Sequence, residues 1–426
     1  MEPGPARPSP ARPTLFSPFS EFSTHLTKRV SETLINNTSS SSSTITLKMV
    51  QTRAKSKKSA EIISSNDDLL TEILVRLPVT SILRFKSVSK HWHSLLTHTH
   101  FTQRYDNISK SPSPGLFASY TYHLAPDAYV PFDVESPSTP PFPTLASCFD
   151  LPGVKIVQSC NGLLLCSTNR GPKGGRGALK YYVFNPTTKQ LALIPPLPGG
   201  GRKTIWFMGL AFHQTDCPHY KLVCVLSAVG PDVDLYQIQI YSSDARKWKI
   251  AIQSFPASSI FPARPGVYWN GAVYWAPFPD NSNFLYFKMD SEQLQTLPLP
   301  VGFICSYFGE SRGHLHLIAY NIHQENRLRL NLYEMLSHHS RWFVKYQVQL
   351  DALPNAFPDM IWQNGYIFNV IDVVRGEEEE DTFVVLKTPK KIIKCNVHDK
   401  SFKEIFDFGE YPYENFHRYI ETLSYF

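Results

Sequence analysis

A pattern of strands and turns recurs through most of this chain, from about residue 110 onward, and it limits the possible folds more than any other feature. Apolar or alternating runs typical of β-strands occur at 180–184, 221–226, 235–241 and 383–386. In a first repeated piece, one strand ends in a polar turn and the next begins with a bulky residue. The turn centres lie near 185, 243, 290, 337 and 398. The pattern thus returns about every 50 residues.

A second repeated piece, a short turn followed by an apolar strand, lies between the copies of the first. Its copies are CNGLLLCS at 160–167, WNGAVYWA at 269–276, RGHLHLIAY at 312–320 and QNGYIFNV at 363–370. A four-stranded propeller blade needs about this length and buries its faces only against neighbouring blades. We therefore expect an all-β repeat domain that is β-propeller-like. A non-repeating β-sandwich whose hairpins happen to look alike is the alternative.

Residues 65–105 show a helical period instead. Ser65 or Asn66 suits a helix N-cap, the two aspartates that follow suit the positive end of the helix dipole, and Pro78 ends the helix. Thr80 or Ser81 could cap a second helix, and a third short segment follows. The apolar positions are Leu69, Leu70, Ile73, Leu74 and Leu77, then Ile82, Phe85, Val88 and Trp92, then Leu95, Leu96, Phe101 and Tyr105. Three short helices cannot bury all of these side chains alone.

The charge of the chain is concentrated at one end. Residues 1–60 hold nine Lys/Arg and three Asp/Glu, which equals the net charge of +6, and the remainder holds 33 residues of each sign. A neutral body gives little reason to bind nucleic acid. The Pro-, Ser- and Lys-rich composition of 1–60 predicts a disordered tail. An organelle transit peptide is the alternative for this segment.

The seven cysteines include no CxxC pair, and several lie in apolar runs. This usage predicts reduced thiols and a location in the cytoplasm, the nucleus or both. No apolar run is long enough to span a membrane, so we expect no membrane association.

The segment 64–105 resembles the F-box. Asp67-Asp68, Leu69-Leu70, Ile73-Leu74, Arg76-Leu77-Pro78, Ile82-Leu83-Arg84-Phe85 and Val88-Ser89-Lys90-x-Trp92 fall in register with that family, and Ser65-Asn66 replaces its opening Leu-Pro. The pieces at 160–166, 183–190, 209–225, 239–249 and 269–276 resemble, in order, the kelch-related F-box-associated domain of plant F-box proteins. The resemblance divides the chain into a tail (1–60), a three-helix F-box (61–108) and a β-repeat domain (109–426), an α+β multidomain protein.

This resemblance implies a substrate-recognition adaptor of a Skp–cullin–F-box type ubiquitin ligase. The F-box would dock on a Skp-type subunit, and through it on cullin, while the β domain would capture an unidentified target protein. The adaptor itself would be neither an enzyme nor dependent on a cofactor. The residues expected to contact the Skp-type subunit are Leu69, Leu70, Ile73, Leu74, Leu77, Pro78, Ile82, Leu83, Val88 and Trp92.

Several groups of residues could form a metal, phosphate or catalytic site, but each fits a purely structural role better. His213, Cys217, His219 and Cys224 lack the paired spacing of a zinc site and span a predicted hairpin. The glycine-rich segment 171–177 lacks the spacing of a phosphate loop, and we expect a hairpin tip. His314 and His316 share one strand face. No metal or catalytic residue is therefore assigned.

Two other functions remain open at this point. A kelch-like propeller could act as an oxidase or bind carbohydrate, with the helices only structural, although the spacing of an oxidase metal site is not evident. Alternatively, an F-box protein could act outside a ligase. For target binding, the first places to look are the loops near 171–177, 200–206 and 261–269.

Overall fold

The computed structural model describes most of the chain from Ser65 to the C-terminus. The described residues are 62–63, 65–108, 115–119, 127–135, 140–142, 145–149, 153–170, 176–198, 205–227, 235–256, 266–276, 283–299, 303–321, 328–336, 341–363, 365–409, 413–424 and 426. The predicted tail, 1–60, lies outside them. The chain divides into two compact units, residues 1–101 and 102–426, and each is described here by itself.

The first unit contains the helices α3 (Asp67–Leu74), α4 (Val79–Phe85) and α5 (Lys90–Thr97), and α6 (Thr99–Ile108) crosses into the second. Asn66 caps α3: its side-chain oxygen accepts hydrogen bonds from the backbone N–H of Asp68 at 3.0 Å and of Leu69 at 3.1 Å. The predicted cap is confirmed. Ser65-Asn66 thus supplies a helix start in place of an apolar contact.

The predicted second helix is divided in two. It ends at Phe85, and Ser89 starts α5 by accepting a hydrogen bond from the Trp92 backbone N–H at 3.1 Å. The predicted caps Thr80 and Ser81 are wrong, because Pro78 itself stands at the start of α4 with no side-chain cap. Proline tolerates this position since its fixed φ suits a helix start and no N–H is needed there.

The second unit contains five four-stranded antiparallel sheets, each formed by four consecutive strands. Blade 1 is β3–β6 (Lys155–Cys160, Leu163–Arg170, Arg176–Asn185, Gln190–Leu193); blade 2 is β7–β10 (Ile205–His213, Cys217–Ser227, Leu235–Ser242, Lys247–Pro256); blade 3 is β11–β14 (Val267–Trp269, Ala272–Trp275, Asn283–Lys288, Gln293–Pro298); blade 4 is β15–β18 (Phe303–Ser311, His314–Asn321, Arg329–Met335, Trp342–Gln349); blade 5 is β21–β24 (Asn369–Val374, Phe383–Lys387, Lys391–Asn396, Phe402–Asp407).

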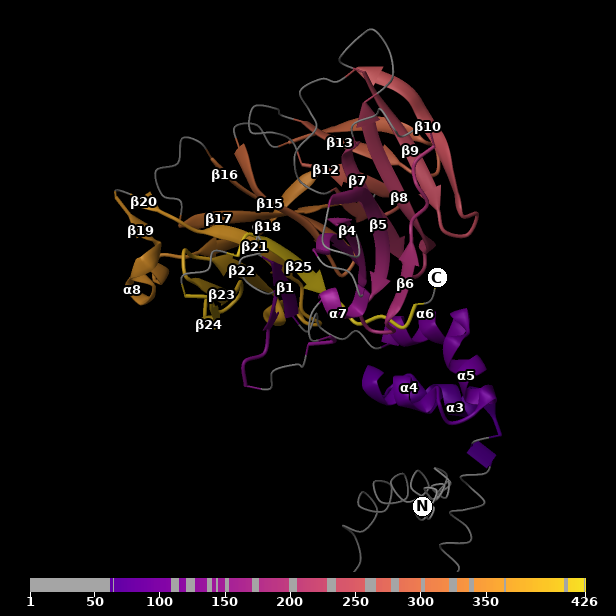
Figure 1. Cartoon of the computed structure of the whole chain (residues 1–426). Helices are drawn as coiled ribbons and strands as arrows, with labels where there is room; N and C mark the ends of the chain where they lie inside the picture. Colours follow the sequence, from indigo (N-terminus) through magenta and orange to yellow (C-terminus); the bar gives the residue numbers. More distant parts are fainter. Residues whose placement is uncertain are drawn as a thin grey trace, which may run out of the picture. The chain divides into compact units, whose positions relative to one another are not determined.

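The sixth blade joins the two ends of the β domain. Its strands are β2 (Ala128–Pro131), β1 (Gly115–Ser119) and β25 (Asn415–Tyr419), in that order across the sheet. Figure 1 shows the yellow β25 beside the indigo β1, and Leu116 pairs with Arg418. The last strand therefore closes the ring against the first. The expected all-β repeat domain is confirmed, as a six-bladed propeller.

Apolar clusters fill every interface around this ring. One cluster spans blades 1, 2 and 3, and others lie between blades 3 and 4, 4 and 5, 5 and 6, and 6 and 1. Representative fully buried members, in that order, are Leu222, Phe284, Val384, Val385 and Leu164. Each blade covers its neighbours, which is why the repeats are stable only as a closed set.

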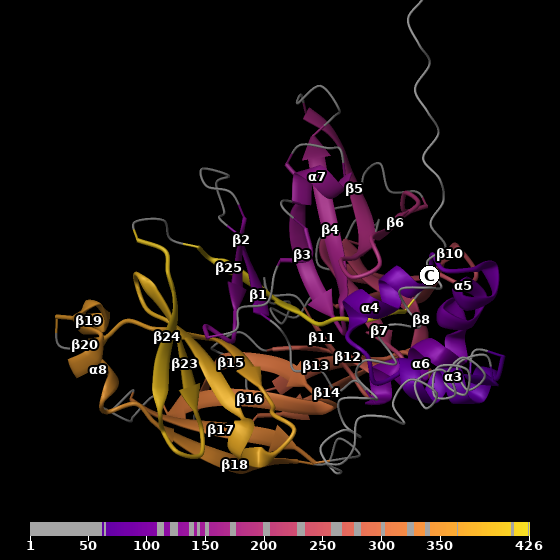
Figure 2. The ribbon, with the colours of Figure 1, turned by 90° about the horizontal axis from the view of Figure 1, so that it is seen from below.

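The predicted repeats match the blades with one exception. The first repeated piece connects the last two strands of blades 1 to 5, and the second forms the first turn of blades 1, 3 and 4. The copy at 363–370 does not form the first turn of blade 5. It contains β20 (Gly365–Tyr366), which pairs with the preceding β19 (Ile361–Trp362) in a separate hairpin that follows α8 (Leu353–Ala356) at the periphery of the domain (Figure 2). Local turn residues specify a hairpin but not its sheet.

The C-terminal residues fasten the end of α6 to the propeller. Within the second unit, the Asp106 carboxylate accepts hydrogen bonds from Thr422 Oγ1 at 2.8 Å and from Ser424 Oγ at 3.3 Å. Burial raises the pKa of Asp106 to about 6. Asn185 Nδ2 donates to the carbonyl oxygens of Thr422 and Ser424, and the Phe426 ring packs edge-on against Tyr220. Residues 420–426 therefore run across blades 1 and 2.

Gly162 should be essential for seating this C-terminal segment. Its φ is +92°, and an added Cβ would lie 2.4 Å from Thr422 Cγ2 and 2.8 Å from the Ile420 carbonyl oxygen. We expect Gly162→Ala to lower the free energy of unfolding by about 2–4 kcal/mol, from left-handed backbone strain plus the clash. Gly271 occupies the same turn position of blade 3 with φ +75° and open space around it. Gly271→Ala should cost only about 1 kcal/mol. If urea unfolding showed an equal loss of stability in Gly162→Ala and Gly271→Ala, the result would contradict this account.

Candidate functional site

The residues predicted to contact a Skp-type subunit fall into three classes of exposure. Leu69 and Pro78 are exposed, and Leu69 retains 46% of its accessible surface. Four are half-buried: Ile73, Leu77, Leu83 and Val88. Four are buried: Leu70, Leu74, Ile82 and Trp92. The exposed and half-buried residues leave apolar surface on the helical unit. The four buried residues are not accessible to another protein in this conformation.

Side-chain contacts also connect the helices of the helical unit to one another. The imidazole Nε2 of His91 lies 2.8 Å from Asp67 Oδ1, which joins the start of α5 to the start of α3. The Phe85 and Trp92 rings meet edge to face, with centroids 5.5 Å apart. Burial lowers the pKa of Lys86 to about 8. The His91–Asp67 and Phe85–Trp92 contacts hold α3, α4 and α5 together and thereby fix the position of Leu69.

A cavity of about 410 Å³ lies along the axis of the propeller. The first strands of blades 1, 3, 4 and 5 line it, together with β25 of blade 6. Apolar lining side chains alternate with polar ones that include Gln158, Glu310, Asp372, Glu414 and Arg418. Gln158 is fully engaged: its amide nitrogen donates to the carbonyl oxygens of Leu210 and Gly266, and its oxygen accepts from the Leu210 N–H.

Arg418 reaches from β25 to two other blades. Its Nε lies 2.7 Å from Asp372 Oδ2, and a second guanidinium nitrogen bonds Asp372 Oδ1 and the Val373 carbonyl oxygen. Its remaining terminal nitrogen donates to the Glu310 carbonyl oxygen at 3.0 Å. The Tyr307 hydroxyl also donates to Asp372, at 3.0 Å. This bidentate pair is a closed unit that ties the ring-closing strand to blades 4 and 5.

Glu310 is the lining carboxylate that lacks such a partner. Its Oε1 accepts the Gly313 N–H at 2.6 Å, and its other oxygen has no hydrogen bond to the part of the chain that the structure describes. Burial raises the pKa of this carboxyl group, and the Gly313 N–H together with the nearby Arg418, His213 and His314 offsets only part of that effect. The axis of the propeller thus holds one poorly compensated acid.

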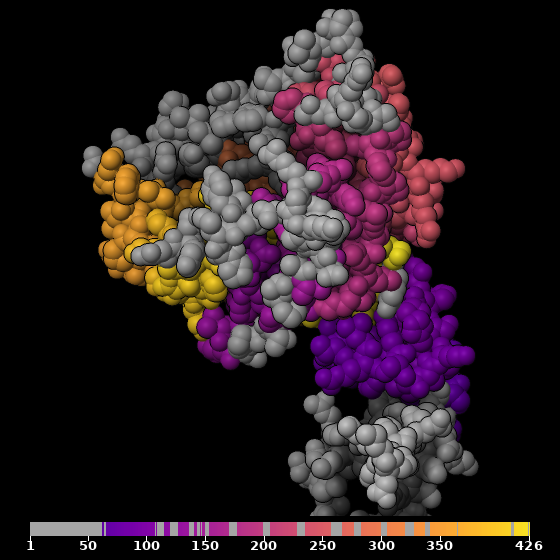
Figure 3. All heavy atoms as spheres, viewed as in Figure 1, coloured from indigo at the N-terminus to yellow at the C-terminus, as the bar shows by residue number. Residues whose placement is uncertain are grey.

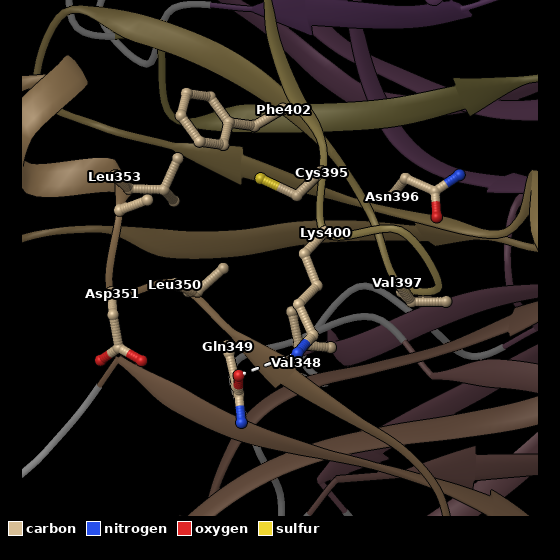
Figure 4. Close-up of a pocket in the computed structure, with 11 residues that line it drawn as sticks. Val348, Gln349, Leu350, Asp351, Leu353, Cys395, Asn396, Val397, Lys400 and Phe402 are labelled. Atoms are coloured by element: carbon tan, nitrogen blue, oxygen red, sulfur yellow. Dashed lines mark hydrogen bonds between the residues drawn. The ribbon is translucent and has the colours of Figure 1, made fainter.

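A smaller hollow, of about 170 Å³, lies between the end of β18 and the turn from β23 to β24 (Figure 4). Leu353, Cys395 and Phe402 supply apolar lining, and Lys400 Nζ donates to Gln349 Oε1 at 3.0 Å. The neighbouring α8 and β19–β20 form the orange outer surface in Figure 3. There Trp362 is 60% exposed, so this region offers apolar contact area.

The groups set aside as metal or phosphate sites are placed as follows. Cys224 is fully buried in β8, and Cys217 Sγ donates to the His219 carbonyl oxygen at 3.4 Å, while Asp216 binds the His213 ring. His314 Nδ1 lies 2.9 Å from Glu334 Oε1. Among the described residues, no three His, Cys, Asp or Glu side chains are arranged to share a metal ion.

The loops suggested for target binding fall mainly outside the described residues. At their described ends, Trp206 at the start of β7 is 57% exposed, and its ring packs edge-on against Tyr236. All seven cysteines are free thiols. Within the part of the chain that the structure describes, no helix has the length and apolar character needed to cross a membrane.

Comparison with known families decides the classification. Residues 66–104 match the F-box domain, and residues 135–415 match the F-box associated beta propeller domain. The chain belongs to the F-box proteins that carry an F-box-associated β-propeller. The resemblance found in the motifs is therefore confirmed.

Several curated proteins are similar to this F-box protein in sequence. F-box protein At5g07610 of Arabidopsis thaliana is 32% identical over 403 residues, covering 87% of this chain and 93% of the relative. F-box only protein 8 and F-box/kelch-repeat protein At3g23880, from the same plant, are 28% and 27% identical, over 55% and 59% of this chain and 79% and 71% of their own. These three relatives are all named as F-box proteins.

The sequence motifs located the helical surface but missed the axial cavity. Arg418 and Asp372 are 46 residues apart and belong to no recognisable motif. One signal was present, a charged residue within the otherwise apolar strand run at 370–374. A buried charge in a strand requires a partner, although only the fold shows which one.

Proposed function

We propose that this F-box protein is the target-recruiting adaptor of a Skp–cullin–F-box type ubiquitin ligase, acting in the cytoplasm, the nucleus or both. The F-box, over 61–108, binds a Skp-type subunit and through it cullin. The β domain, over 109–426, binds the protein to be ubiquitinated. The adaptor supplies no catalytic group, because the transfer chemistry belongs to other subunits.

The observation that carries this proposal is the F-box match at 66–104 together with exposed apolar surface on its helices. Leu69 is 46% exposed beside half-buried Ile73 and Leu77. Apolar anchors on a helix face are what a groove on another protein binds. The propeller supports the other half of the proposal, since its closed ring presents many loops from a rigid frame.

Deleting residues 66–104 from the tagged chain tests both halves. We expect the deletion to remove the Skp-type subunit from affinity purifications to the background level, while a target bound by the propeller remains. With the intact chain, that target should be ubiquitinated and should accumulate when the proteasome is blocked. Undiminished co-purification of the Skp-type subunit with the deleted chain would contradict the proposal.

A further inference from the structure

The charges along the propeller axis are not balanced. Three carboxylates line the cavity, those of Glu310, Asp372 and Glu414, against the single guanidinium of Arg418. No lysine is among the described residues that line it. Because charges in a cavity are screened less than charges on an open surface, this excess favours a positively charged occupant over a negative one.

The guanidinium in the cavity is not a free anion-binding group. Arg418 uses its nitrogens on both Asp372 oxygens and on the carbonyl oxygens of Glu310 and Val373. An incoming carboxylate or phosphate would have to break this closed pair before it could be bound. Removing a partner from a buried ion pair is strongly unfavourable, so anions are poor candidates.

Glu310 differs from Arg418 because its hydrogen-bonding capacity is not fully used. One of its oxygens has no hydrogen bond to the described residues, and the charge of Arg418 is already committed to Asp372. Burial of this acid is unfavourable, as the raised pKa of its carboxyl group reflects, and the neighbouring Arg418, His213 and His314 offset that effect only in part. A cation that entered the cavity would offset this penalty.

Further features of the lining suit a cation on a flexible chain. Tyr268 and Phe308 add aromatic rings, which also attract cations. Glu414 and Asn415, at the start of β25, are exposed and mark a route to solvent.

We propose that the axial cavity of the propeller binds an alkylammonium or guanidinium group, with Glu310 as its counter-ion. Two sources share this chemistry, a lysine or arginine side chain of a captured target and a free polyamine. The first source rests on the proposed adaptor function, whereas the second does not.

The test is a calorimetric titration of the purified full-length chain at low ionic strength, with no ligase subunit present. The probes are N-acetyl-lysine N-methylamide and N-acetyl-norleucine N-methylamide, which differ by the ammonium group. We expect saturable binding of the lysine probe with a dissociation constant of about 1 mM or lower, and binding of the norleucine probe at least about tenfold weaker. Equal binding of the two probes, or no saturable binding of the lysine probe, would overturn the proposal.

The variant Glu310→Gln keeps the shape of the side chain and removes its charge. It should weaken binding of the lysine probe by at least about tenfold. Glu135→Gln, the same change at a carboxylate that is 85% exposed, should leave binding of the probe unchanged. Equal effects of the two variants would mean general charge attraction and would overturn the site. The probe comparison on the unaltered chain keeps the test valid if Glu310→Gln does not fold.

Two more ligands distinguish the sources. Tighter binding of spermidine than of a lysine-containing peptide would assign the cavity to a polyamine, and the reverse order would assign it to a target side chain. Both results support the cation site. Co-purification of the Skp-type subunit is measured separately, so failure of the cavity proposal cannot be confused with failure of the adaptor proposal.

Discussion

Replacing Leu69 and Leu77 together by glutamate should abolish co-purification of the Skp-type subunit while leaving the propeller folded. Leu69 is 46% exposed and Leu77 is half-buried, so both can contribute apolar area to a partner. A central apolar anchor is worth about 2 kcal/mol or more in binding. Two such losses, with charges added at the interface, should weaken the complex by a factor of about 1,000 or more. Co-purification and a binding titration with the isolated subunit measure the change.

Leu179→Glu is the matched control. Leu179 lies in β5 and is 51% exposed, so the substitution makes the same chemical change at similar exposure in the β domain. We expect it to leave the Skp-type subunit bound. Loss of the subunit in the control, or its retention in the double variant, would contradict the assignment of the helical surface.

Leu74 should not be used for this test. It is fully buried, and a charge there would disrupt the packing of the helices themselves. Loss of binding in Leu74→Glu would therefore report unfolding of the F-box as readily as loss of an anchor. The same reservation applies to Leu70, Ile82 and Trp92, which are also buried.

Replacing Arg418 by methionine should open the propeller ring. The variant leaves Asp372 buried without its counter-charge, and removing one partner of a buried ion pair typically costs about 3–5 kcal/mol. The loss falls on β25, the strand that closes the sixth blade against β1. We expect a clear fall in the urea midpoint and earlier proteolysis of the β domain.

An exposed ion pair provides the comparison for this prediction. Lys403 Nζ lies 2.8 Å from Glu135 Oε1, with side chains 51% and 85% exposed. Lys403→Met should change the free energy of unfolding by about 1 kcal/mol or less. The double variant Arg418→Met with Asp372→Leu should recover part of the loss, because no unpaired charge remains. Equal destabilisation by Arg418→Met and Lys403→Met would contradict the role assigned to Arg418.

Local patterns were sufficient to predict the helical type of the F-box segment and the strand type of the repeated hairpins. The helix cap at Asn66, the turns at 161–162 and 270–271, and the strands of blades 1 to 5 all follow from short-range preferences of backbone and side chain. These preferences act between residues a few positions apart, so they are visible in the sequence. The same locality explains the copy at 363–370, which resembles the other copies in sequence but lies in a separate two-stranded sheet.

Contacts between distant residues decided the rest. The pairing of β25 with β1 joins segments about 300 residues apart in the chain, and no local pattern specifies it. The exposure of Leu69 beside the burial of Leu70, and the axial cavity with its closed Arg418–Asp372 pair, likewise depend on what the folded chain brings together. The spacing of the apolar residues and the residues that cap the helices therefore determined which helices and blades form. Ring closure alone decided which charges meet at the axis, because burial is a property of the assembled ring and not of any single strand.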